Sequence, residues 1–319
     1  GLLLSNLGWH WIFWVTVPVT VLGAALGWVL VPVSTPLGRD ATFDWRGALL
    51  LIPALCGLMM TLTELNAGGP LSPSVLACAI VAAALLAGFV WWDGRAPAPL
   101  IDLGLFRSRA FTGGTVAALL SYAMLYGMFF AMSFALVRGY RDAPVSAGLR
   151  LAIIPAALGL VAPFSGRLSE RWPRLATRGG TGLCAAAALG LSQTLTGGLG
   201  GEPAMTLLLA AYGVGLGLFI APNNGATLAA APAEHAGQAG GLLNLMRAFG
   251  TATGVAAASA LLAWRVEQAT GFHGRTVGVS ERALLGAASD VMILLATLAL
   301  ATALAASFED RRRTPPRRA

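Results

Sequence analysis

PFSGRLSERWPR, residues 163–174, is a short charged stretch between two long apolar runs. It brings a glycine, an acid and three arginines together within twelve residues. A charged interruption of this kind is typical of a turn that faces water between two membrane-spanning helices. The stretch therefore predicts a polytopic membrane protein with a water-facing turn at this position.

The charged cluster consists of Gly166, Arg167, Glu170, Arg171 and Arg174. Its spacing resembles the loop signature of the major facilitator superfamily, which lies on the cytoplasmic side between the second and third helices of a six-helix half. A small residue allows close helix approach, while Glu170 could pair with an arginine or cap a helix end. The resemblance implies a latch that locks one face of a transporter. From the residues alone, an arginine-rich loop that only sets topology explains the cluster equally well.

The composition is that of a membrane protein. Hydrophobic residues make up 56% of the chain and charged residues 11%, and the mean hydropathy is +0.73. Nine windows of at least 16 residues contain no Asp, Glu or Arg: 1–38, 47–63, 65–92, 110–137, 151–166, 179–201, 203–233, 248–264 and 291–308. Because about 20 apolar residues cross a bilayer as a helix, we predict an all-α membrane bundle with about nine transmembrane helices.

The net charge of +7 comes entirely from arginine, since the chain contains no lysine. The arginines lie between apolar spans rather than on one soluble face, which favours the positive-inside rule over nucleic-acid binding. With alternating spans, 15 arginines fall on the side of the charged cluster and the C-terminal tail, and 6 on the opposite side. We therefore expect a multi-pass protein of the cell membrane with a cytoplasmic C-terminus.

Neither the cysteines nor the histidines predict a metal or cofactor site. The cysteines are Cys56, Cys78 and Cys184, all within apolar windows. The histidines are His10, His235 and His273, which are far apart in the sequence and lie at or beyond span ends. Scattered cysteines form neither a disulfide framework nor a zinc motif, so we interpret them as small packing residues.

The chain begins at Gly1 inside an apolar segment, and we interpret it as a fragment. Residues 1–7 are expected to end one helix, and GWHWIFWVTVP, residues 8–18, to begin the next. The second string resembles the start of the sixth helix in drug exporters of the fourteen-helix branch of the superfamily. It departs from that pattern at His10 and Thr16. Residues 1–31 are thus expected to be the remnant of an N-terminal six-helix bundle.

Two further regions complete the expected organisation. Residues 32–110 would hold the central two-helix insert of the fourteen-helix branch and a linker; PAPLIDLGLFRSRAF, residues 97–111, resembles the branch's approach to its C-terminal half. Residues 111–319 would form a C-terminal six-helix bundle with a basic cytoplasmic tail. The charged cluster then falls between the second and third of these six spans, the position that the family assigns to its latch.

Four residues in the first span of the C-terminal half recur at helical spacing: Tyr122, Tyr126, Phe129 and Ser133. They lie on one helical face. The resemblance places this helix beside the central cavity, so the face could stack on and hydrogen-bond an aromatic or cationic substrate. The alternative is a packed face between two helices.

Tyr212, Asn223 and Asn224 are further candidates for the substrate cavity. Pro222 and the two asparagines near the end of an apolar run suggest a broken helix whose amides face water or a cavity. An ordinary helix C-terminus followed by turn residues is the alternative.

AGQAGGLLNLMRAFGTATGVAAA, residues 236–258, resembles the penultimate helix of the same exporters. Gly250 and Gly254, four residues apart, predict a close-packed helix contact. We expect Asn244 and Arg247 to act as gate or helix-orienting groups; the alternative for Arg247 is snorkelling to the interface.

Together these features predict a proton-coupled efflux transporter, not an enzyme, that exports drug-like or amphipathic molecules by alternating access. Its expected partners are a small-molecule substrate, protons and the lipid bilayer, and it is expected to be monomeric when complete. The acids lie in loops, in the tail or at span ends, so coupling carboxylates are expected on N-terminal helices. The alternatives are an exporter of one metabolite or siderophore, and a truncated membrane relic or scaffold that transports nothing.

Overall fold

A computed structural model describes residue 8 and residues 10–30, 43–68, 72–173, 175–198, 201–270 and 279–307. All regular elements in these ranges are helices. Seven of them are long and apolar enough to cross a membrane, as judged over the described residues. Helix α3 (Thr16–Leu30) is a shorter apolar helix, and α8 (Gly180–Leu195), of 16 residues, is not one of the seven. The predicted all-α membrane fold is confirmed, while the expected helix end at residues 1–7 lies outside the described residues.

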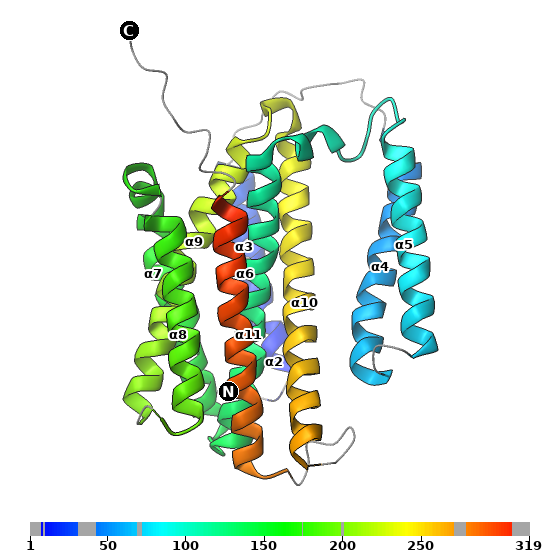
Figure 1. Cartoon of the computed structure of the whole chain (residues 1–319). Helices are drawn as coiled ribbons and strands as arrows, with labels where there is room; N and C mark the ends of the chain where they lie inside the picture. The colour runs from blue at the N-terminus through cyan, green and yellow to red at the C-terminus, as the bar shows by residue number, and fades with distance from the viewer. Residues whose placement is uncertain are drawn as a thin grey trace.

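Six of these helices form the main bundle (Figure 1). They are α6 (Arg109–Phe134), α7 (Pro144–Arg171), α8, α9 (Glu202–Ala229), α10 (Ala236–Thr270) and α11 (Glu281–Ser307). Helix α6 packs against α10 and α11, and α9 packs against α7 and α8. Contacts of α11 with α8 and of α6 with α9 join these two groups of three helices. The shared core is therefore built by all six helices.

Glycine allows two of these helices to approach at backbone distance. A Cβ atom on Gly250 would lie 2.3 Å from the carbonyl oxygen of Leu119, and one on Gly254 would lie 2.2 Å from that of Ala123. Since real Cβ atoms do not approach this closely, α6 and α10 can pack in this way only because α10 has no side chain at either position. In a bilayer, where lipid tails are as apolar as leucine, such close packing is a main source of helix association.

The central hairpin lies beside the bundle (Figure 1). Its helices α4 (Trp45–Gly68) and α5 (Pro73–Asp93) pack on each other, and α4 also contacts α10. Ser72 begins α5 by accepting a hydrogen bond from the Val75 amide at 3.3 Å, with Pro73 at the first helical position. At the other end of α5, the Trp92 indole donates to Asp44 at 3.0 Å and so ties the hairpin together.

The connection from α5 to α6 is folded onto the start of α10. It contains the short helix η1 (Leu103–Arg107), and a small apolar core consists of Leu105, Phe111, Ala239 and Leu242. Asp102 lies 3.3 Å from the His235 ring nitrogen Nε2. The Gln238 amide accepts from the Asp102 backbone N–H at 3.1 Å and donates to the Pro99 carbonyl at 3.1 Å. The predicted linker is therefore an ordered part of the bundle end.

The N-terminal helices α2 (His10–Trp14) and α3 pack on each other but have almost no buried surface. No described side chain of α3 is buried, and Trp28 is 91% exposed. An apolar helix without a packing partner in water is unfavourable, whereas in a bilayer its surface contacts lipid or another helix.

Candidate functional site

The charged cluster is helical, contrary to the prediction of a turn over residues 163–174. Helix α7 includes Pro163 and continues to Arg171. It ends at Trp172, whose φ of −138° and ψ of 66° leave the helical region. Long arginine side chains can reach the membrane surface while their backbone stays helical, so charge alone does not end a helix. Only the last part of the stretch forms the turn, and Arg174 lies outside the described residues.

The cluster faces outward from the bundle. Gly166, Arg167, Glu170 and Arg171 are all exposed. A Cβ atom on Gly166 would meet no atom within 4 Å, so this glycine is not required for close helix packing here. No ion pair joins Glu170 to another residue within the described ranges. The cluster thus presents two arginines and a carboxylate to a surface that the described chain leaves uncovered.

The four predicted residues of α6 lie on one half-buried face, as their spacing indicated. The rings of Tyr126 and Phe129 meet edge to face, with centroids 6.1 Å apart. The Arg247 guanidinium of α10 lies over the Tyr122 ring, 5.4 Å from its centroid. Such a cation–π contact is worth about 0.5–1 kcal/mol at an exposed position. The face therefore offers π surfaces with one cation at its edge.

Tyr212 does not belong to this face. Its side chain is fully buried, and its hydroxyl donates to the Met124 carbonyl at 3.0 Å. The ring is a packing element between α9 and α6, because the hydroxyl is already paired inside the bundle. The assignment of Tyr212 to the substrate cavity is therefore not supported by its position.

The two asparagines lie within α9, which neither breaks nor ends at residues 221–224 as the two alternatives proposed. The helix continues through Pro222 to Ala229. Asn223 is buried; its Nδ2 donates to the Gly114 carbonyl at 3.0 Å, while its Oδ1 has no hydrogen-bond partner in the described chain. Asn224 is half-buried. A buried amide of this kind joins two helices in an apolar environment.

Asn244 and Arg247 lie in the third turn of α10, since this helix begins at Ala236. Both side chains are exposed. Gly250, one turn further on, would place a Cβ atom 2.9 Å from the Cβ atom of Tyr122. The close helix contact thus fixes how the Arg247 side chain and the Tyr122 ring face each other.

Sequence reasoning missed a polar cluster at the opposite end of the bundle from the charged cluster. Arg150 of α7 lies 3.2 Å from Asp142 and also pairs with Glu202 of α9. Arg150 and Asp142 are mostly buried, with 19% and 15% of their side chains exposed. Residues 52 positions apart carry no spacing signal, so this cluster becomes visible only when α7 and α9 pack together.

Metal-binding geometry is not found among the described residues: no three His, Cys, Asp or Glu side chains are grouped there. Cys184 is buried and directs its thiol to the Tyr212 carbonyl at 3.5 Å. His235 pairs with Asp102, and His273 lies outside the described residues.

The fold and these faces define a polytopic helical membrane protein with a six-helix bundle as its main unit. Residues 1–255 match the family model of the Major Facilitator Superfamily. The chain belongs to this superfamily.

The similar curated proteins include exporters. "Multidrug resistance protein Stp" of Mycobacterium tuberculosis is 32% identical over 271 residues, covering 83% of this chain and 49% of that protein. "Tetracenomycin C resistance and export protein" of Streptomyces glaucescens is 31% identical over 269 residues, with the same two coverages of 83% and 49%. "Riboflavin transporter RibZ" of Clostridioides difficile is 27% identical over 268 residues, covering 82% and 56%. The chain spans about half the length of these relatives. The names of these relatives are those of resistance, export or transport proteins.

Proposed function

We propose that the chain is the C-terminal part of an efflux transporter that exports drug-like, amphipathic molecules by alternating access. The observation that carries this proposal is the half-buried aromatic face of α6, with Arg247 over Tyr122 at its edge. Large π surfaces that are only partly covered can stack on flat amphipathic molecules. Similarity to two proteins named for drug resistance or export supports transport out of the cell.

Coupling to protons is part of the proposal. An antiporter needs a carboxylate whose protonation changes as it meets the two sides of the membrane. The described acids of the six-helix bundle lie in connections or near helix ends, with the exception of Asp290, which is nine residues into α11 and pairs with Arg265. The others are Asp142, Glu170, Glu202, Glu234, Glu267 and Glu281. We therefore place the coupling carboxylates on helices of the N-terminal half.

The exposed cluster on α7 is proposed as one half of a latch. Arg167, Glu170 and Arg171 would pair with groups of the N-terminal half when the cytoplasmic side closes. Their exposure in this structure supports the proposal, because a latch needs an accessible surface when its partner is absent. The complete protein is proposed to act as a monomer in the cell membrane.

The test is proton-dependent efflux of a fluorescent dye from cells that express the complete reading frame. Tyr126→Ala should raise the dye concentration for half-maximal efflux by about 3- to 10-fold, the loss of roughly one stacking contact. Leu189→Ala, a control at an exposed apolar side chain of α8, should leave it unchanged. Dye retained equally with and without a proton gradient would contradict proton coupling and favour a non-transporting membrane relic.

The latch has its own pair of variants. Arg171→Ala should lower the maximal efflux rate, whereas Arg178→Ala should not, although both arginines are exposed and lie at the same end of the bundle. Equal rates for the two variants would count against a latch at Arg171. If cells export one metabolite or siderophore but none of a panel of unrelated dyes, the protein is a specific exporter and the proposed broad substrate range is wrong.

A further inference from the structure

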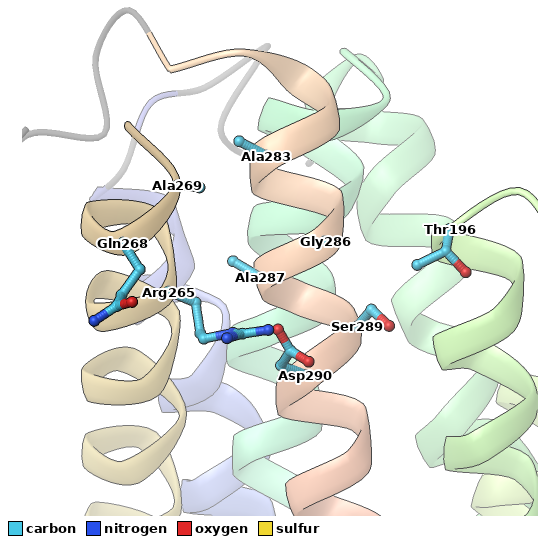
Figure 2. A pocket seen from close by; sticks show the side chains of 9 residues that line it. All are labelled: Thr196, Arg265, Gln268, Ala269, Ala283, Gly286, Ala287, Ser289 and Asp290. Atoms are coloured by element: carbon cyan, nitrogen blue, oxygen red, sulfur yellow. The ribbon is translucent and has the colours of Figure 1, made fainter. Parts of the chain in front are cut away.

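Helices α8, α10 and α11 form a hollow of about 510 Å³ at the end of the bundle where α10 finishes and α11 begins. Its polar lining consists of Arg265, Asp290, Gln268, Ser289 and Thr196. Figure 2 shows Arg265 reaching from α10 to Asp290 on α11, while Thr196, at the end of α8, lies on the other side of α11, toward which Ser289 points. This hollow is distinct from the aromatic face of α6, and its polar side chains have no part in the proposed transport mechanism.

Small residues keep the hollow open. Ala283, Gly286 and Ala287 line it along α11, and Ala269 lines it from α10. A Cβ atom on Gly286 would meet nothing within 4 Å. The space is therefore set by residues that are too small to fill it, and a bulkier side chain at position 286 would occupy it.

The ion pair of Arg265 and Asp290 leaves some of its donor and acceptor groups without a partner in the described chain. The Arg265 Nε–H donates to Oδ2 of Asp290 at 2.5 Å. Within the described ranges, the other contact of the guanidinium is with the ring of Trp264, 5.7 Å away. The side chains of Arg265 and Asp290 are 42% and 29% exposed. Two Nη groups of the arginine and one carboxylate oxygen can thus bind a ligand without breaking the pair.

An apolar track leads away from the hollow along the same face of α11. Ile293, Leu300 and Leu304 are 44%, 57% and 69% exposed, at spacings that keep them on the face of Asp290. From Ile293 to Leu300 the helix rises roughly 10 Å, within the roughly 15 Å of one leaflet's hydrocarbon. A charged pair at the end of a lipid-facing apolar track matches a molecule with a zwitterionic head and an alkyl tail.

We propose that this hollow binds the headgroup of a phospholipid with a primary ammonium, such as phosphatidylethanolamine. The phosphate contacts the Arg265 Nη groups, the ammonium donates to the free oxygen of Asp290, and an acyl chain lies along α11. A choline headgroup has no N–H to donate, and a glycerol headgroup has no cation to offset the charge of Asp290. The site therefore selects the ethanolamine headgroup over both.

The test measures lipid retention by the purified chain in detergent, using native mass spectrometry and equimolar ethanolamine, choline and glycerol phospholipids with identical acyl chains. The wild-type chain should retain the ethanolamine lipid about 3- to 10-fold better than either competitor, corresponding to one or two charge-assisted hydrogen bonds. Arg265→Gln and Asp290→Asn should each remove this preference. The matched control Arg141→Gln, which breaks an exposed pair with Glu281 outside the hollow, should keep it.

Gly286→Leu makes the test independent of the ion pair, since it fills the hollow and leaves both charges in place. It should also remove the preference, and its thermal unfolding midpoint shows that the chain is folded. Equal retention of the three lipids by the wild-type chain would overturn the proposal. So would a preference for the glycerol lipid, or an ethanolamine preference that survives Gly286→Leu or Asp290→Asn. The outcome does not depend on whether the protein transports anything.

Discussion

At the scale of single residues, the bundle depends on where side chains are absent. Gly250 and Gly254 allow α10 to rest on the backbone of α6, and the spacing of these two glycines in the sequence predicts such a contact. The burial of Tyr212 was not predictable in the same way. A periodic pattern shows which residues share a face but not whether that face meets another helix, lipid or a cavity, and only the packing of α9 on α6 decides this.

The glycine contact gives a prediction in which one substitution has opposite effects at two positions of one helix. Alanine normally stabilises a helix by about 1 kcal/mol relative to glycine. Gly241→Ala should follow this rule or be neutral, because its Cβ atom would meet nothing within 4 Å. Gly254→Ala should instead cost about 1–3 kcal/mol, because its Cβ atom would push against the backbone at Ala123.

Unfolding of the purified chain by a denaturing detergent measures both variants against the wild type. If Gly254→Ala is as stable as Gly241→Ala, the two helices do not approach as closely as described.

The buried arginine of α7 gives a second prediction. Arg150→Ala leaves Asp142 largely buried without its cation, so it should lower the free energy of unfolding by roughly 1–3 kcal/mol. Arg141→Ala breaks an ion pair with Glu281 whose side chains are 80% and 51% exposed. It should change the free energy of unfolding by less than about 1 kcal/mol. The same detergent titration compares the two. Equal losses for both arginines would show that burial does not distinguish the two pairs.

At the scale of elements, helix α7 shows where sequence reasoning reaches its limit. The charged stretch correctly marks the end of a span, but the helix continues to Arg171 because its backbone hydrogen bonds do not depend on side-chain polarity. Helix α9 likewise continues through Pro222, and α11 begins at Glu281, ten residues before the apolar window that starts at residue 291. The apolar windows at α7 and α11 locate membrane helices but are shorter than the helices themselves, whereas the window over residues 203–233 covers nearly all of α9.

A spin-label scan tests the helical form of the charged cluster. Nitroxides placed singly at residues 163–171 should show mobility and accessibility with a period near 3.6 residues, as in any α-helix. Residues 140–143, which lie between two helical segments, provide a control without that period. Uniformly high mobility over residues 163–171 would contradict the helix and support the turn predicted from the sequence.

At the scale of the whole molecule, the sequence predicted the class of fold, the family and the six-helix unit. Composition and the arginine pattern carry the class of fold, because the bilayer constrains every span in the same way. The family and the six-helix unit follow instead from the resemblance of the charged cluster and of residues 236–258 to family motifs. The Arg150–Glu202 and Arg265–Asp290 ion pairs, which join residues 52 and 25 positions apart, could not be predicted, and neither could the hollow at Asp290. These features depend on which helices are neighbours, and hydropathy alone does not specify that.

The central claim is that the arginine-dense end of the six-helix bundle, with the charged cluster of α7, faces the cytoplasm. In a background without Cys56, Cys78 and Cys184, single cysteines at two exposed arginines, Arg171→Cys and Arg282→Cys, test it with a membrane-impermeant thiol reagent on intact cells. Arg282→Cys should be labelled directly and Arg171→Cys only after permeabilisation. Labelling of Arg171→Cys from outside, with Arg282→Cys protected, would contradict it.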